Sequence, residues 1–198
     1  MSAEIRASYT KSGLRQLKRE HADAWEQLAA AVGQAALDDV RGASTLGWLP
    51  AELHGLIADA MIDAAGRDCA RALWAAVILD AFDRPMLSAI VSGALRLYGR
   101  TPPSVMRMTP HAWPLIFREC GRSWMEPTGE DRAMMLFEEL PRAIIASTGI
   151  LDSFLGNCDA ALHYTGHTGA VNPDYERLAA GGFAIDVQWQ LPTPNVQL

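Results

Sequence analysis

The sequence predicts an α+β fold, in which an N-terminal helical part is followed by a four-stranded antiparallel sheet in the order ββαββ. Three observations predict it: apolar residues recur at helical spacing in the first two-thirds of the chain, period-two alternation begins after Gly121, and one long helical pattern separates two pairs of strands. We expect residues 1–190 to form a single domain, with residues 1–121 as its helical part, residues 122–190 as its sheet part and residues 191–198 as a flexible tail.

The helical part should begin with an amphipathic stretch over residues 4–40, which Gly13 and Gly33 would break. A second helix is expected between Pro50 and Gly66, because proline suits the first turn of a helix and glycine its end. Further helices are expected over residues 67–82 and 85–99, and over residues 104–121, where Pro110 and Pro114 should kink or split the helix.

The sheet part should open with a hairpin of two strands joined by a loop that contains Gly129. Its elements are expected as strands over 122–126 and 132–138, a helix over 141–164, and strands over 170–178 and 183–190. In the last strand, strict alternation places four apolar side chains on one face: Phe183, Ile185, Val187 and Trp189.

Composition excludes several classes of protein. The 198 residues carry 17 Lys and Arg against 23 Asp and Glu, a net charge of −6, which argues against nucleic-acid binding because phosphates are bound by Lys and Arg. No apolar run reaches the roughly 18 residues that would cross a bilayer, and the N-terminus lacks the apolar segment of a signal peptide. We therefore expect a cytoplasmic protein with no membrane span.

Sequence motifs give no sign of an enzyme. Glycine-rich nucleotide motifs and the GxSxG turn of hydrolases are absent from the sequence. Cys69, Cys120 and Cys158 lack paired spacing, so they predict buried thiols rather than disulfides or a zinc site. His163 and His167 are four residues apart but have no third ligand beside them. We expect a non-enzymatic protein with no metal and no cofactor.

Large aromatic side chains in the middle of the chain would either fill an ordinary core or line an apolar pocket. The candidate pocket residues, between the helices and the sheet, are Trp74, Phe82, Tyr98, His111, Trp113 and Phe117. A small apolar molecule is the expected ligand of such a pocket.

Several segments together resemble the superfamily of haem-NO-binding-like domains, which also contains the 4-vinyl reductase domains and the TRAPP-type Golgi transport subunits. They are KSGLRQLKREHADAW, GWLPAELHGLIADAM, the segment from SGALRLYGR to PLIFRECG, and FAIDVQWQ at the end of the last strand. Within that superfamily the chain is most similar to a myxobacterial family of unknown function.

The resemblance implies helices around a four-stranded antiparallel sheet, with any ligand between the two. Haem members hold the iron through a histidine on the helix before the first strand, and the propionates through a tyrosine–serine–arginine motif around the second strand. Here residues 86–100 contain no histidine, the second strand reads RAMMLFE, and His111 lies beyond that helix. The cysteines of 4-vinyl reductases are also missing from residues 169–190. These departures argue against haem.

Three functions therefore stay open. The first is a non-enzymatic small-molecule-binding or sensory and regulatory domain. The second is a protein-interaction module that acts as a homodimer or assembly subunit without a ligand, which the amphipathic start and Trp48 would suit. The third and least favoured is a haem-binding gas sensor or an enzyme that uses His111. An enclosed apolar cavity between helices and sheet would favour the first.

Overall fold

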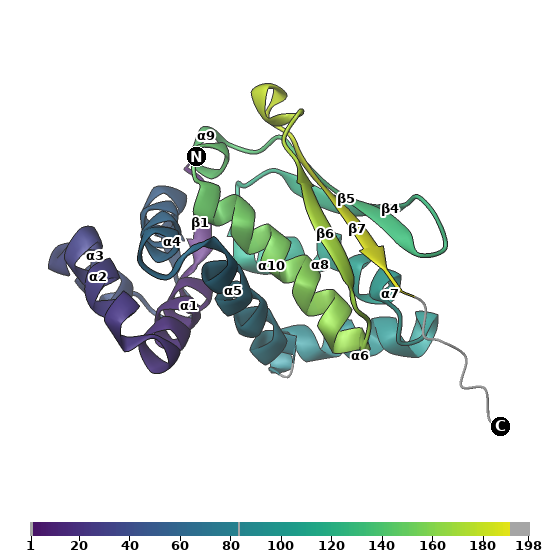
Figure 1. Ribbon diagram of the computed structural model, residues 1–198, viewed down its shortest axis with the longest axis horizontal. Coiled ribbons are helices and arrows are strands. Elements are labelled where there is room, and N and C mark those ends of the chain that lie inside the picture. Colours follow the sequence, from purple (N-terminus) through teal and green to yellow (C-terminus); the bar gives the residue numbers. More distant parts are fainter. Residues whose placement is uncertain (1, 83, 191–198) are drawn as a thin grey trace.

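The computed structural model, which describes residues 2–82 and 84–190, places its long helix α10 (Thr148–Thr165) between a four-stranded sheet and the N-terminal helices (Figure 1). The sheet is antiparallel throughout, with the strand order β4-β5-β7-β6. Its strands are β4 (Arg122–Pro127), β5 (Arg132–Glu138), β6 (Gly169–Asp174) and β7 (Phe183–Trp189). The α+β class and the ββαββ order predicted from the sequence are confirmed.

Strand β7 is an inner strand, paired with β5 and with β6, and its apolar side chains alternate as predicted. Phe183, Ile185 and Val187 have no exposed surface and Trp189 is buried. The register pairs Phe183 with Phe137 of β5 on one side and Trp189 with Gly169 of β6 on the other. One face of this strand therefore belongs to the core.

The chain before this sheet is mostly helical. Its elements are β1 (Glu4–Arg6), α1 (Ala7–Glu20), α2 (Ala22–Val32), α3 (Gln34–Gly42), β2 (Trp48–Pro50), α4 (Ala51–Ala65), α5 (Arg67–Phe82), α6 (Pro85–Tyr98), α7 (Pro102–Met106), α8 (Thr109–Ile116) and β3 (Phe117–Arg118). The short strands form a second sheet, β2-β1-β3, which the sequence did not predict. It joins the N-terminus to the residues just before β4.

The N-terminal helices divide at different residues from those expected. Gly33 does separate α2 from α3, with a φ of 83°. Gly13 does not break the chain: it lies inside α1, where a Cβ would come within 2.6 Å of the Trp74 ring. The break falls instead at His21, whose φ of −140° takes the backbone out of the helix. Gly13 therefore allows the Trp74 ring to pack closely against α1 and does not end the helix.

Three other boundaries differ from the predictions. The expected helix over 141–164 is divided, because Ser147 caps α10 and leaves α9 (Arg142–Ile145) as a separate turn. Strand β6 ends at Asp174 instead of residue 178, and the 3-10 turn η1 (Leu178–Ala180) follows it. The expected split helix over 104–121 begins earlier, at Pro102, and is divided between α7 and α8.

Buried apolar residues from both parts of the chain belong to one connected cluster, which runs from Ala3 to Trp189. Within residues 2–82 and 84–190, no helix is long and apolar enough to cross a membrane. The predicted flexible tail, residues 191–198, lies outside the described residues.

Candidate ligand-binding site

A cavity of about 90 Å³ lies between α5, helices α6 to α8, strand β5 and α10. Most of its lining is apolar: Ile78, Phe82, Ile90, Val91, Val105, Met106, Met108, Ala112, Trp113, Ile116, Phe117, Met135, Phe137, Phe154 and Ala161. Thr109, Asn157 and Cys158 are its other lining residues. Such a lining suits a small molecule with little polarity.

Aromatic rings from α8, β3, β5 and α10 form part of the wall of the cavity. Trp113 stacks on Phe117 with a centroid separation of 4.2 Å, and Phe137 stacks on Phe154 with a separation of 4.9 Å. Trp113 and Phe154 meet edge to face at 5.2 Å, which joins the two stacks. The indole of Trp113 also donates a hydrogen bond of 3.1 Å to the Gly121 carbonyl, so its ring orientation is set.

The structure brings three of the six predicted pocket residues together. Phe82, Trp113 and Phe117 line the cavity. Trp74 is fully buried elsewhere, Tyr98 is 50% exposed, and His111 is exposed on α8. Ligand binding by any of these residues stays a prediction.

Sequence reasoning missed most of the other lining residues. Those of α10, such as Asn157 and Ala161, lie on a helix that is buried on nearly every side. Met135 comes from the strand that lacks the tyrosine and serine of haem members. Met106 and Met108, flexible apolar residues close to the candidate aromatic ones in the sequence, were predictable as pocket residues, and both line the cavity.

A buried aromatic cluster adjoins the cavity. Tyr9 stacks on Trp74 at 5.0 Å and on His54 at 5.5 Å, and its hydroxyl donates to Asn157 Oδ1 at 3.1 Å. His54 Nδ1 lies 2.8 Å from Thr10 Oγ1, while His54 Nε2 has no hydrogen-bond partner among the described residues. Burial lowers the pKa of His54 to about 3 and moves the pKa of Tyr9 well above its usual range. Both rings are therefore neutral near pH 7.

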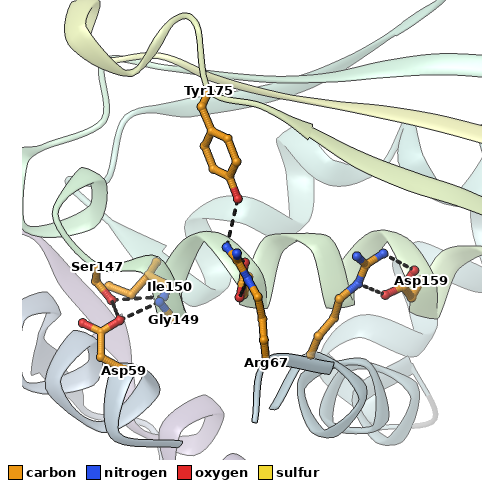
Figure 2. A network of polar contacts seen from close by, with 9 residues as sticks. Asp59, Arg67, Ser147, Gly149, Ile150, Asp159 and Tyr175 are labelled. Atoms are coloured by element: carbon orange, nitrogen blue, oxygen red, sulfur yellow. Dashed lines mark hydrogen bonds and ion pairs between the residues drawn. The ribbon is translucent and has the colours of Figure 1, made fainter. Parts of the chain in front are cut away.

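Two ion pairs hold α5 against α10 (Figure 2). Arg67 donates to both carboxylate oxygens of Asp152, at 2.6 and 2.9 Å, and also to the Tyr175 hydroxyl at 3.0 Å. One turn further along, Arg71 donates to both oxygens of Asp159, at 2.5 and 2.8 Å. These paired contacts fix one wall of the cavity.

The N-terminus of α10 is attached to α4 in a similar way (Figure 2). Asp59 Oδ1 accepts hydrogen bonds from the Gly149 amide at 2.6 Å and from the Ser147 hydroxyl at 3.1 Å. Ser147 in turn accepts from the Ile150 amide, which is the usual cap of a helix start. Helices α4, α5 and α10 thus form one hydrogen-bonded unit.

The residues around the cavity do not fit a haem. A cavity of about 90 Å³ is smaller than the engineered cavity of about 150 Å³ that holds benzene. Among the described residues that line it there is no histidine, and its methionines would bind haem iron only as partners of another ligand. Burial and the neighbouring Asp159 raise the pKa of the Cys158 thiol, whereas a cysteine bound to haem is a thiolate.

No family model and no curated protein matches this chain. Solved structures do match it over nearly the whole length. They include an Fe(II) unliganded H-NOX protein from K. algicida (TM-score 0.65, 10% identity, 95% of this chain and 98% of that one) and the I5F mutant of T. tengcongensis H-NOX (TM-score 0.59, 12% identity, 96% of this chain and 100% of that one). A further match comes from a study of heme distortion in the H-NOX family (TM-score 0.61, 13% identity, 98% and 100% covered). The likeness shows the fold alone: this chain has the haem-NO-binding-like fold of the H-NOX domains.

Proposed function

We propose that the chain is a non-enzymatic sensory or regulatory domain that binds a small apolar molecule, without haem, in the cavity between α5, α8, β5 and α10. The observation that carries the proposal is the cavity itself, which is apolar and lies between the helices and the sheet. The solved H-NOX structures, one of them an Fe(II) protein, share this fold, and this likeness is compatible with a ligand-binding sensory domain. The lining of this chain favours a neutral molecule over a haem.

The two walls of the cavity differ in how they are held. Helices α5 and α10 are joined by the ion pairs of Arg67 and Arg71. On the opposite wall, no ion pair joins residues 84–117 to the rest of the described chain; its side-chain ties include the hydrogen bonds from Arg100 to the Tyr164 carbonyl and from Arg6 to the Leu115 carbonyl. A molecule that contacts both walls would therefore shift helices α6 to α8 rather than α5 and α10. That shift would be the regulatory output.

Xenon is a suitable first probe, because it is apolar, small and known to enter dry protein cavities. We expect xenon to change the methyl NMR signals of Ile78 and Ile116 in a saturable way. Ala161 lines the cavity, so Ala161→Met should fill it and abolish the response. The matched control is Ala30→Met, on the exposed side of α2, which should respond like the natural chain.

Two results would contradict the proposal. The first is a response to xenon that is equal in Ala161→Met and in the natural chain. The second is a Soret band from stoichiometrically bound haemin, together with a rise in thermal stability, which would restore the haem alternative.

Self-association is a second candidate function, and one observation favours it. Leu97 and Tyr98, neighbours at the end of α6, are 76% and 50% exposed. Contiguous exposed apolar patches mark contact surfaces, and these two side chains would contribute to one. Native mass spectrometry should detect a homodimer that Leu97→Asp abolishes, and a monomer at every concentration would exclude this candidate.

A further inference from the structure

A second hollow lies apart from the central cavity, between α1, α2 and α3. It is a surface groove of about 360 Å³, with an apolar floor formed by Leu14, Leu37 and Val40. The half-buried ring of Trp25 forms one side of it.

The rim of this groove is cationic although the chain as a whole is acidic. Lys11, Arg15, Lys18 and Arg41 line it, and among the described lining residues there is no carboxylate. The full sequence has a net charge of −6, so four cations around one groove are a local reversal of the overall charge. A local excess of one sign around a hollow attracts ligands of the opposite sign.

Two of these four cations are already engaged. The Lys11 ammonium donates to the carbonyls of Arg41 and Ala43, which end α3. The Arg41 guanidinium pairs with Asp38. Both contacts tie α3 to its place beside α1, and they leave these two cations with little capacity for a ligand.

The other two cations are available. Arg15 and Lys18 are both exposed and lie one turn apart on α1, so their side chains emerge on the same side of the helix. No ion pair involves either of them within the described part of the chain. The Lys18 ammonium lies 5.4 Å from the centre of the Trp25 ring, a cation–π distance. The cationic rim of the groove and its aromatic side are therefore in contact at Lys18 and Trp25.

We propose that this groove binds an amphipathic organic anion, whose carboxylate pairs with Arg15 and Lys18 and whose apolar body lies against Trp25. The charge of the rim selects an anion, and the half-buried Trp25 ring selects a ligand with a hydrocarbon or aromatic body, since Leu14, Leu37 and Val40 below it are already almost fully covered. The site is separate from the central cavity and shares no lining residue with it. It therefore does not depend on the function proposed above.

Decanoate is a suitable probe, with decanol and decyltrimethylammonium as neutral and cationic controls of the same chain length. Decanoate and decyltrimethylammonium are titrated below their micelle concentrations, and decanol below its solubility limit, into protein labelled with ¹⁵N. We expect decanoate to shift the indole N–H signal of Trp25 and to leave that of Trp113 unchanged, because a ten-carbon chain is too long for the cavity of about 90 Å³. Added salt should weaken decanoate binding, and the cationic control should not bind.

Charge-reversal variants test the rim. Arg15→Glu should weaken decanoate binding at least about fivefold, since it removes one attractive charge and adds a repulsive one. Arg96→Glu on α6 makes the same change in net charge at another exposed arginine and should leave the affinity unchanged. Trp25→Ala should weaken binding of decanoate through loss of apolar contact.

Three results would overturn the proposal. Equal affinities of Arg15→Glu and Arg96→Glu would show that the rim does not hold the carboxylate. A response of Trp113 in place of Trp25 would assign the ligand to the central cavity. Tighter binding of a polyglutamate peptide than of decanoate would assign the groove to an acidic protein partner.

Discussion

Arg67 and Asp152 form a two-point ion pair in which the carboxylate is buried and the guanidinium is 52% exposed. The two partners should therefore contribute unequally to stability. Arg67→Ala leaves an unpaired carboxylate in the interior and should lower the free energy of unfolding by about 2 kcal/mol, less than for a fully buried pair because water can reach the vacated side. Asp152→Asn leaves Arg67 free to hydrate and keeps a hydrogen bond, so it should cost about 1 kcal/mol. Urea denaturation measures both, and equal losses would contradict this asymmetry.

Gly149 is expected to be the least replaceable glycine of α10. A Cβ at this position would lie 2.3 Å from the carbonyl carbon of Ala58 and 2.5 Å from its oxygen, and backbone atoms cannot move aside as a side chain can. Gly149→Ala should therefore lower the free energy of unfolding by about 3 kcal/mol. Gly93→Ala is the matched control: it lies inside α6 with nothing within 4 Å, and the change should stabilise the protein by roughly 0.5–1 kcal/mol. Destabilisation of equal size in both variants would contradict the packing argument.

The sheet and its long helix were predictable because their patterns are local. Strand β7 shows its buried face through alternation alone, and the hairpin of β4 and β5 is marked by the loop around Gly129. The second sheet was not predictable, since its strands have two or three residues and Ile5 pairs with Phe117, far along the chain. Too few residues alternate in such strands for a period to be recognised.

The site was predictable only in part, for a related reason. Helix α5 is apolar on nearly every side, so its sequence could not show whether Trp74 and Phe82 pack against the same neighbour. Trp74 is directed towards α1, where Gly13 leaves room for its ring, and Phe82 is directed towards the cavity. Which neighbour a buried aromatic residue contacts depends on the packing of helices, and this information is not local in the sequence.

The three free thiols should differ in reactivity. Cys69 is half-buried, with its Sγ 3.3 Å from His21 Nε2, whereas Cys120 and Cys158 are buried. Burial raises the pKa of Cys120 to about 11 and raises the pKa of Cys158 further still. In the folded protein we expect a bulky disulfide reagent to modify Cys69 alone, at a rate that rises with pH, because burial and Glu20 also raise the pKa of Cys69.

Counting released chromophore tests this order of reactivity. Cys69→Ser should abolish the reaction of the folded chain, and denaturant should expose all the remaining thiols. Rapid modification of a second thiol without denaturant would show that the core opens more readily than its packing indicates.

Stability should fall in mild acid because of His54. This ring has no exposed surface, and burial lowers its pKa from 6.5 to about 3 in the folded chain. Between these two values the unfolded chain binds a proton that the folded chain does not, so the free energy of unfolding decreases as the pH falls through this window. Above pH 6.5 the free energy of unfolding is not reduced by this proton uptake, and between about pH 7.5 and 5 it should fall by about 2 kcal/mol because of His54.

His54→Gln should reduce this pH dependence by that amount, whatever its effect on absolute stability, whereas His111→Gln on the exposed side of α8 should leave it unchanged. If urea denaturation across this pH range gave the same slope for His54→Gln and the natural chain, His54 would have to be protonated inside the fold, and its contacts with Thr10, Tyr9 and Trp74 would have to accommodate a cation.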